Sequence, residues 1–443
     1  MTTIFSTDSP LLKVWTKVSF SYICQMSQIV DILPLLAATR KASTQLASAD
    51  APTKISVLHR LADLLREEQV SIIRENAKDL ANIDPENPMR DRLLLTEARI
   101  EALAASLHDV AALPDPSGQV LIDKVIANGL HLQKIAVPLG VVGVIYESRP
   151  NVTIDVAALC IRSGNAAVLR GGTDAWFTNQ VLVDLIHQAL TSQQLSTDLV
   201  RLLPTDRAHV TTLLQATKYI DVIIPRGSDA LIQRVRRESL VPTIETGAGV
   251  CHTYVAERAN LEMAVPIVVN AKVSRPSVCN SLDTVIVHRT QLTDFVQKIA
   301  ADFIQYKVQI FADSAAFDAL SAIQYPYLHR AESADFGREF LDFACSMKVV
   351  DDLAEALNHI DQFSSRHSEA IVTEDTAEAQ LFLQAVDAAA VYWNASTRFT
   401  DGGVFDLGAE IGISTQKLHA RGPFALEKLV TEKWVIQGSG QIR

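Results

Sequence analysis

The segment PLGVVGVIYESRPNVTIDVAALCIRSGNAAVLR, at residues 138–170, contains the clearest indication of the fold. An apolar, β-branched run at Val141–Glu147 is typical of a buried strand. A run with helical character follows at Thr153–Ser163, and a second apolar run follows at Ala166–Arg170. This order predicts two parallel strands that are joined by a crossover helix.

The same alternation of strands and helices continues toward the C-terminus. Further strands are expected at Leu199–Leu203, Asp221–Pro225 and Thr243–Thr246, with a helix at Thr178–Leu190. A second series of strands is expected at Thr284–His288, Val308–Phe311, Ala370–Thr373 and Ala389–Trp393. We therefore predict an α/β protein with two doubly wound α/β domains and a ligand cleft between them.

The flanking sequence predicts different structure. Residues 30–106 show apolar side chains at helical spacing. The runs Val120–Ile126 and Leu130–Val137 read as a β-hairpin, because Asn128-Gly129 is a preferred two-residue turn. Lys433–Gln437 is expected to be the last strand.

Composition limits the classes of partner. The 443 residues include 40 Lys and Arg against 51 Asp and Glu, a net charge of −11, which disfavours nucleic acid and anionic lipid. No apolar run approaches the roughly 18 to 20 residues that a membrane-spanning helix needs. Five cysteines lie far apart, at positions 24, 160, 251, 279 and 345. We expect free thiols in a reducing cytoplasm and no bound metal.

The loop at residues 270–280 holds the sharpest candidate for chemistry. Cys279 follows an apolar helix, and Lys272 and Arg275 are close to it in sequence. Cations lower a thiol pKa from about 8.5, and the thiolate is the nucleophilic form. An isolated loop cysteine is nevertheless more often inert, so the residues alone leave both readings open.

Asn151 lies in a second polar loop, directly after the strand expected at Val141–Glu147. Its amide could donate a hydrogen bond to an oxyanion. It could equally cap the helix that is expected to begin near Thr153.

Two glycine-containing loops link an expected strand to an expected helix. They are Arg170–Asp174 and Pro225–Asp229, in which backbone N–H groups could approach a phosphate at a helix N-terminus. Either loop could also be a plain turn. The adjacent Cys251 and His252 precede a strand-like run, so we interpret His252 as structural. The dense polar stretches at residues 394–403, 408–412 and 419–423 are expected to form a cleft wall.

Ten of these strings, in this order, resemble the γ-glutamyl phosphate reductases of the aldehyde dehydrogenase superfamily. The resemblance runs from about residue 29 to 443. The strings are Asp91–Thr96, Pro138–Glu147, Arg149–Val152, Ser163–Ala166, Pro225–Gly227, Gly249–Tyr254, Asn270–Lys272, Arg275–Asn280, Asn394–Gly403 and Ser414–Pro423.

The resemblance implies a role for several of these residues. It makes Cys279 the nucleophile, with the Asn151 amide and the Cys279 backbone N–H as oxyanion donors. It places Glu339 at the nicotinamide ribose of NADPH. The other implied cofactor residues are Arg170, Gly171 and Gly172 near the adenosine ribose, and Pro225, Arg226, Gly227 and Ser228 near the pyrophosphate. The candidate substrate residues are Arg149, Lys272, Arg275, Arg398 and Arg421.

The implied activity is NADPH-dependent reduction of L-glutamyl 5-phosphate to L-glutamate 5-semialdehyde through a thioester, the second step of proline biosynthesis. An aldehyde-oxidising NAD(P)-dependent dehydrogenase and a catalytically silent relative remain alternatives. Hydrolytic relatives hold a glutamate base where this chain has Ile244, with Glu245 next to it. A separate glutamate 5-kinase is a possible partner, and a homo-oligomer is expected.

The resemblance also divides the chain into segments. We expect an N-terminal extension at 1–25, or a later start at Met26, and a helical part of the cofactor domain at 26–118. The hairpin at 119–137 and a C-terminal strand at 433–443 would form an oligomerisation flap. The cofactor domain would occupy 138–248, the catalytic domain 249–409, and a return to the cofactor domain 410–432.

Overall fold

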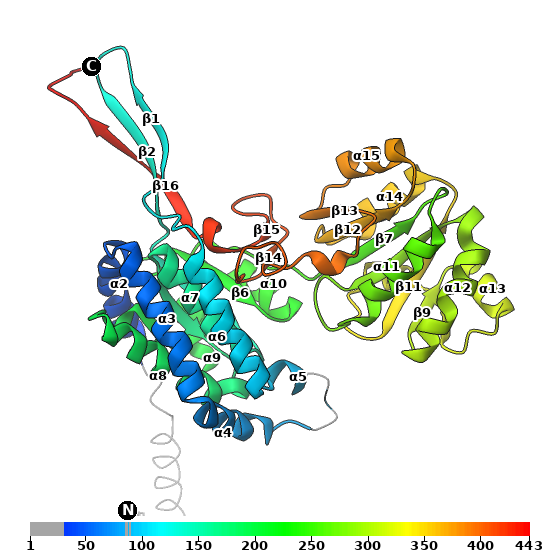
Figure 1. The fold of residues 1–443 in the computed structure, drawn as a ribbon, viewed down its shortest axis with the longest axis horizontal. Coiled ribbons are helices and arrows are strands. Elements are labelled where there is room, and N and C mark those ends of the chain that lie inside the picture. The colour runs from blue at the N-terminus through cyan, green and yellow to red at the C-terminus, as the bar shows by residue number, and fades with distance from the viewer. Residues whose placement is uncertain (1–30, 85–86, 88–89) are drawn as a thin grey trace, which may run out of the picture.

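The computed structural model describes residues 31–84, 87 and 90–443 (Figure 1). The predicted extension at residues 1–25 lies outside the described residues. The chain begins with helices, as the apolar spacing predicts. These helices are α2 (Leu33–Ala47), α3 (Ala51–Glu67), α4 (Gln69–Leu80), α5 (Arg90–Leu93) and α6 (Glu97–Ala112).

A four-stranded parallel sheet forms the first α/β unit, in the order β5-β4-β3-β6. Its strands are β3 (Val141–Tyr146), β4 (Ala166–Arg170), β5 (Val200–Leu202) and β6 (Val222–Arg226). All six residues of β3 are buried, because helices cover both faces of the sheet. The helices are α7 (Asn151–Ser163), α8 (Trp176–Ser192), α9 (Arg207–Leu214) and α10 (Asp229–Glu238). The side chains of α3 and α6 extend the same apolar core.

A seven-stranded parallel sheet forms the second α/β unit, in the order β10-β9-β11-β8-β7-β12-β13. Its strands are β7 (Cys251–Val255), β8 (Leu282–His288), β9 (Gln309–Ala312), β10 (Leu328–Arg330), β11 (Ala344–Val350), β12 (Ser368–Val372) and β13 (Ala390–Trp393). The helices are α11 (Leu261–Val273), α12 (Leu292–Gln305), α13 (Ser314–Ala322), α14 (Leu353–Phe363) and α15 (Thr376–Ala385). This unit has apolar cores of its own.

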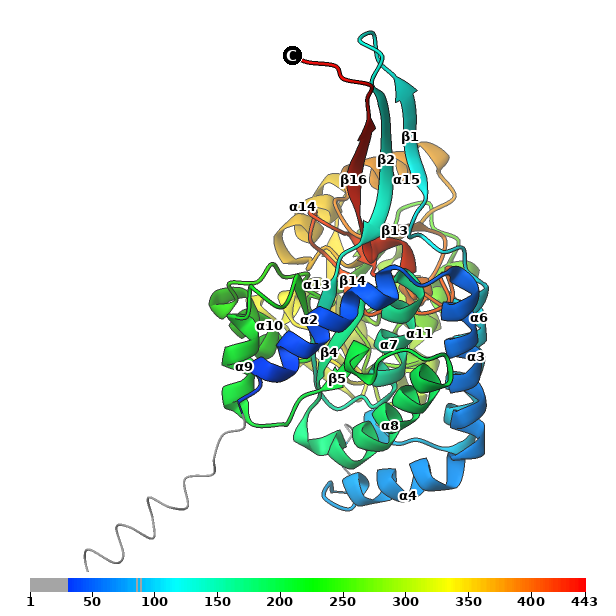
Figure 2. The same ribbon diagram turned by 90° about the vertical axis from the view of Figure 1, so that its left-hand side faces the viewer.

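A three-stranded antiparallel ribbon projects away from both units (Figures 1 and 2). The predicted hairpin is confirmed as β1 (Val120–Val125) and β2 (His131–Pro138), which meet across the turn at Asn128-Gly129. The final strand β16 (Val430–Gln437) pairs with β2 along its whole length. It therefore begins three residues earlier than the sequence predicts.

The sequence-based assignment of strands needs several corrections, and the short strand β10 is among the strands that it missed. Thr243–Thr246 is not a strand, because only Thr243 pairs, in an isolated bridge with Ile223. The strand β11 was not predicted, although it lies between β9 and β8. Its sequence, Ala-Cys-Ser-Met-Lys-Val-Val, has few β-branched residues, so its extended conformation depends on pairing with both neighbours.

A buried ion pair ties three helical segments of the first unit together. Asp115, which follows α6, accepts from the Lys54 ammonium at 3.0 Å, and its carboxylate lies 3.1 Å from Nη1 of Arg162. The Lys54 and Arg162 side chains are only 3% and 4% exposed. Removing Asp115 would leave two buried cations without their shared counter-charge.

We expect Asp115→Ala to lower the free energy of unfolding by about 3 kcal/mol, because the substitution leaves the buried charges of Lys54 and Arg162 uncompensated. Urea denaturation followed by circular dichroism measures the change. Glu67→Ala is the matched control, because it removes a carboxylate from the exposed pair with Arg60, and its effect should be much smaller. Equal effects of the two substitutions would contradict the assignment.

Candidate active site

Cys279 is the most accessible cysteine in the described part of the chain. Cys160, Cys251 and Cys345 are buried, whereas Cys279 is partly accessible. It lies in the segment Ser274–Ser281, the Cys279 loop, which connects α11 to β8.

Two cavities meet at Cys279. The first has a volume of about 450 Å³ and the second about 370 Å³. Cys279 lines both of them, together with Arg92, Arg149, Arg226 and Ile413. A group bound in one cavity can therefore approach the same sulfur as a group bound in the other.

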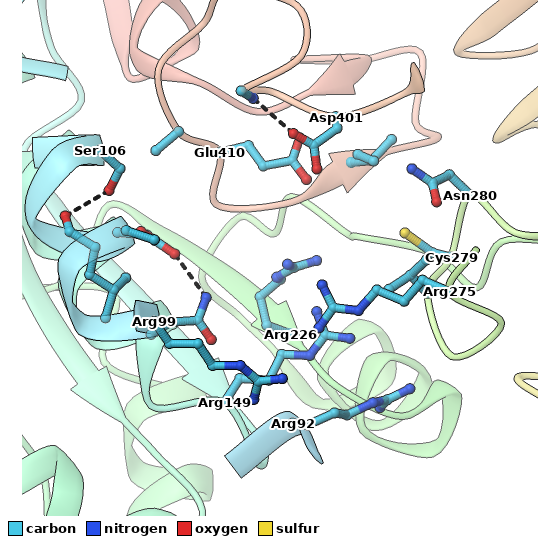
Figure 3. A pocket seen from close by; sticks show the side chains of 18 of the residues that line it. Arg92, Arg99, Ser106, Arg149, Arg226, Arg275, Cys279, Asn280, Asp401 and Glu410 are labelled. Carbon is cyan, nitrogen blue, oxygen red and sulfur yellow. Dashed lines mark hydrogen bonds between the residues drawn. The ribbon is translucent and has the colours of Figure 1, made fainter. Parts of the chain in front are cut away.

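Arginine side chains dominate one side of the first cavity (Figure 3). The set consists of Arg92, Arg99, Arg149, Arg226, Arg275 and Arg398. They come from the N-terminal helices, from the first sheet and from the segments around Cys279, so the chain brings them together only on folding. Such a concentration of guanidinium groups suits a ligand with more than one anionic group.

The Cys279 loop is fixed from both sides. Arg92 donates to the Ser277 carbonyl at 2.6 Å. The Asn280 amide donates to the Thr400 carbonyl at 2.8 Å, and Arg398 donates to the Asn280 side-chain oxygen. The loop is thus tied to the N-terminal helices and to the polar stretch at residues 394–403.

Gly249 packs directly against the peptide of Cys279. A Cβ atom at position 249 would lie 1.6 Å from the Cys279 carbonyl oxygen and 2.5 Å from its carbonyl carbon. The Cys251 thiol also donates to that carbonyl, at 3.3 Å. The start of β7 therefore sets the position of the Cys279 backbone, and only glycine permits the approach.

The electrostatic environment of Cys279 is a balance of opposed effects. Burial raises the pKa of the Cys279 thiol, while the guanidinium groups of Arg226 and Arg149 oppose that rise. The expectation that nearby cations lower this pKa is wrong in its net direction, because desolvation of the thiolate outweighs them. Burial, with Arg226 and Arg92 close by, also lowers the pKa of Arg149 to about 10.

Asn151 lines the first cavity as the first residue of α7. It does not cap that helix: the N-cap is Pro150, and no side-chain hydrogen bond caps the helix. The Asn151 amide donates instead to the Asp155 carboxylate at 3.0 Å, one turn further along. Burial raises the pKa of Asp155 to about 6.

The second cavity is lined by a carboxylate and by the glycine-containing loop after β6. Glu339 lines it and accepts from the Gly249 N–H at 2.9 Å. Gly227 and Ser228 line it from the loop after β6, where the Ser228 N–H donates to Glu147 at 2.8 Å. A Cβ atom at Gly227 would lie 2.4 Å from the Glu147 carboxylate, so a side chain here would require Glu147 to move.

Four candidate cofactor residues lie outside the described lining of both cavities: Arg170, Gly171, Gly172 and Pro225. Arg170 ends β4 and donates to the carbonyls of Thr205, at 2.5 Å, and Gly171, at 3.2 Å. The nearby Asp174 accepts from Ser148 rather than from Arg170. The Pro225 carbonyl accepts from the Thr246 hydroxyl at 2.7 Å.

The structure places two candidate substrate residues away from the cavities. Lys272 is fully buried, and its ammonium donates to the Ala344 carbonyl at 2.8 Å and lies 4.0 Å from Asp283. Asp283 in turn accepts from the Phe340 N–H at 2.9 Å, so this pair supports the segment that carries Glu339. Arg421 donates to the Asp387 carboxylate at 2.6 Å.

Comparison with known proteins assigns the chain to a protein family. The sequence profile described as the aldehyde dehydrogenase family matches residues 17–318. This chain belongs to the aldehyde dehydrogenase family. Acetylating aldehyde dehydrogenase from Geobacillus thermoglucosidasius shares the fold, with a TM-score of 0.68 at 15% identity over 93% of this chain and 97% of that one. The predicted aldehyde dehydrogenase-like α/β fold is confirmed.

Within that family the chain belongs with proteins named γ-glutamyl phosphate reductase. The γ-glutamyl phosphate reductase of Pelodictyon phaeoclathratiforme is 50% identical over 410 residues, covering 92% of this chain and 98% of the relative. That of Legionella pneumophila is 50% identical over 415 residues, covering 93% and 99%. The crystal structure of the Thermotoga maritima reductase matches with a TM-score of 0.87 at 37% identity, over 93% of this chain and all of that one.

Ile244 and Glu245 occupy the region that holds the base in hydrolytic members of the family. Ile244 is buried in the core of the first unit. Glu245 is absent from the described lining of either cavity, and its carboxylate lies 3.7 Å from Arg236. Neither side chain borders the site beside Cys279.

Several residues that line the first cavity were not predicted from the sequence. Arg92 lies in the string at residues 91–96, which contributed to the resemblance without receiving a role. Asp155 and Glu410 also line the cavity. Glu410 belongs to the stretch at residues 408–412, which the sequence marked only as a cleft wall.

The described residues contain neither a cluster of metal ligands nor a helix that could span a membrane. No group of three or more His, Cys, Asp and Glu side chains in that part of the chain is arranged to hold a metal ion. None of its helices has both the length and the apolar character needed to cross a bilayer.

We expect Gly249→Ala to displace the Cys279 loop, because the new methyl group cannot occupy space held by the Cys279 carbonyl. A shift near 1 Å should reduce any reaction that needs the thiol by about 100-fold. The rate of iodoacetamide labelling at Cys279, followed by mass spectrometry, reports the displacement. Gly337→Ala is the control, since its Cβ would meet its nearest neighbour at 3.5 Å. Unchanged labelling in the folded Gly249 variant would refute the contact.

Proposed function

We propose that the protein reduces L-glutamyl 5-phosphate to L-glutamate 5-semialdehyde and phosphate, with NADPH, through a thioester on Cys279. The observation that carries this proposal is the position of Cys279 where an arginine-rich cavity meets a second cavity. The names of the relatives support the same reaction. The step would belong to proline biosynthesis in the cytoplasm.

The first cavity suits this substrate. L-Glutamyl 5-phosphate carries a carboxylate and an acyl phosphate, and arginine side chains bind both groups through paired hydrogen bonds. Arg149 and Arg226 line both cavities next to Cys279, so they are placed for the phosphate at the reacting end. Arg275 and Arg398 line the first cavity only. A bound anion would also offset the burial and the repulsion by neighbouring arginines that together lower the pKa of Arg149.

The first chemical step transfers the acyl group to sulfur. The Cys279 sulfur attacks the carbonyl carbon, the carbon–sulfur bond forms, and the carbon–oxygen bond to phosphate breaks. The thiol proton leaves with the phosphate, so the products of this step are an acyl thioester and hydrogen phosphate. Arg226 and Arg149 favour the thiolate against the effect of burial.

Negative charge develops on the carbonyl oxygen in this step and in the later reduction. The Asn151 amide and the Cys279 backbone N–H are the proposed donors to that oxygen. Asp155 holds one amide N–H of Asn151 through the hydrogen bond at 3.0 Å. This contact fixes the orientation of the side chain before the substrate binds.

The second cavity fits the nicotinamide end of a dinucleotide. Glu339 is held by the Gly249 N–H, and a carboxylate in this position can accept from ribose hydroxyls. Gly227 and Ser228 leave room beside the N-terminus of α10, where a pyrophosphate is favoured. Bound NADPH would supply the hydride that reduces the thioester. Arg170 is the proposed partner of the adenosine ribose phosphate.

The thioester must resist water until it is reduced. Glu245, which is next in sequence to the position that the resemblance gives to the hydrolytic base, lies 3.7 Å from Arg236 and does not line the described walls beside Cys279. This arrangement favours reduction over hydrolysis. It provides no support for the aldehyde-oxidising alternative.

The ribbon of β1, β2 and β16 is the proposed oligomerisation surface. Val120, Leu121, Val125, Trp434 and Ile436 are apolar side chains that it exposes. Exposed apolar patches of this kind often mark protein contacts. A separate glutamate 5-kinase is the proposed source of the unstable acyl phosphate.

Oxidation of glutamate 5-semialdehyde by NADP⁺ tests the reaction in reverse. We expect NADPH to form only when phosphate is present, because phosphate releases the acyl group from Cys279. Cys279→Ala should lower the rate by a factor on the order of 10⁴ or more. Cys160→Ala, which alters a buried thiol of the first core, should retain activity. Phosphate-independent turnover would favour the aldehyde-oxidising alternative.

Asn151→Ala tests the oxyanion assignment. Loss of one preorganised donor should lower kcat by about 10²–10³. The KM for NADPH should change little, since Asn151 lines only the first cavity. Steady-state kinetics with both substrates varied separates these effects. An unchanged kcat would remove Asn151 from the mechanism.

A further inference from the structure

Glu410 is a cavity residue to which the proposed chemistry gives no role. It lines the first cavity, and Figure 3 shows it beside Asp401 on the side opposite Arg92 and Arg149. Burial raises the pKa of Glu410 to about 7, an effect that Arg226 opposes. Such a carboxylate is costly to ionise unless a cation approaches it.

The backbone holds Glu410 in one position. The Gly402 N–H donates to one carboxylate oxygen at 3.0 Å. A Cβ atom at Gly402 would lie 2.9 Å from the Glu410 Cβ, so the two segments are in close contact. This side chain is thus oriented by its surroundings before any ligand binds.

Glu410 lacks a cationic partner among the described residues. No Lys, Arg or His nitrogen of that part of the chain is within 4.0 Å of its carboxylate, although six arginines line the same cavity. The neighbouring acids are engaged differently. Asp155 accepts from Asn151, and one Asp401 oxygen accepts from the backbone N–H groups of Gly403 and Val404.

The substrate of the proposed function supplies the missing cation. L-Glutamyl 5-phosphate carries an α-ammonium group as well as its two anionic groups. Arginines can only donate hydrogen bonds, so none of the six can accept from an ammonium group. A carboxylate on the opposite wall can.

We propose that Glu410 binds the α-ammonium group of the substrate and makes the cavity selective for an α-amino acid over the corresponding acid without nitrogen. This inference rests on the proposed function, because it concerns the same cavity and the same substrate. It makes Glu410 a specificity-determining residue.

A comparison of two aldehydes tests the proposal. Glutamate 5-semialdehyde and 5-oxopentanoate differ by the α-ammonium group, and both can be assayed with NADP⁺ and phosphate. The wild-type protein should prefer glutamate 5-semialdehyde. Glu410→Gln should lower its kcat/KM by about 10- to 100-fold, since a charge-assisted hydrogen bond is lost. The kcat/KM for 5-oxopentanoate should change little.

The control variant removes a different carboxylate from the same cavity. Asp91 also lines this cavity, but unlike Glu410 it has cationic partners, with Arg99 at 2.5 Å and Arg275 at 3.9 Å, and its side chain is half exposed. Asp91→Asn should therefore leave the ratio of the two kcat/KM values as in the wild-type protein. Equal losses with both aldehydes in the Glu410 variant would overturn the proposal and indicate a general effect on the chemistry.

Equilibrium binding tests the role of Glu410 independently of turnover. In a Cys279→Ala background, L-glutamate should bind more tightly than glutarate, and Glu410→Gln should abolish the difference while glutarate binding persists. Retained glutarate binding shows that the variant is folded. A persistent preference for L-glutamate would overturn the proposal. If no aldehyde is oxidised but the binding preference depends on Glu410, the proposed reaction fails and the ammonium site stands.

Discussion

The contact between the Gly249 backbone and the Cys279 peptide is the constraint on which the site depends. It brings the beginning of β7 against the loop that precedes β8, so the N-terminal ends of two interior strands of the seven-stranded sheet determine where the sulfur lies. The Gly249 N–H also binds Glu339. One short segment therefore positions the thiol and the carboxylate of the second cavity with respect to each other.

The charged groups around the Cys279 thiol come from both α/β units, and their effects on the thiol oppose one another. Burial raises the pKa of the Cys279 thiol, and the guanidinium groups that oppose this rise come from the other α/β unit. Those arginines also repel one another, and this repulsion adds to the effect of burial in lowering the pKa of Arg149. An anionic ligand relieves this repulsion, so the groups that bind such a ligand are also those that favour the thiolate.

Much of the fold was accessible to sequence reasoning, because buried parallel strands appear as β-branched runs with polar loops at their ends. The same reasoning singled out Cys279 and Asn151, and the resemblance to the family added Glu339; all three line the cavities. It failed where proximity in sequence was used to infer proximity in space. Lys272 is only seven residues from Cys279, yet it points into the core, since it is on the buried face of α11. Arg92 is 187 residues from Cys279 along the chain, and no local sequence pattern predicts its contact with the Cys279 loop. The strand β11 was missed for a related reason: its neighbours in the sheet, and not its own residues, make it extended.

The chain passes between its two sheets at two places, near residues 246–251 and near residues 400–413. Two such crossings define a line, and rigid rotation of one half against the other about that line is the motion that strains the covalent connections least. Gly249 and Glu410 lie on the crossings themselves, whereas α12 and α13, at the outer end of the second unit, are far from them (Figure 1). Opening the molecule in this way would widen the outer ends of both cavities while the hinge axis, and the reacting sulfur beside it, stay nearly in place.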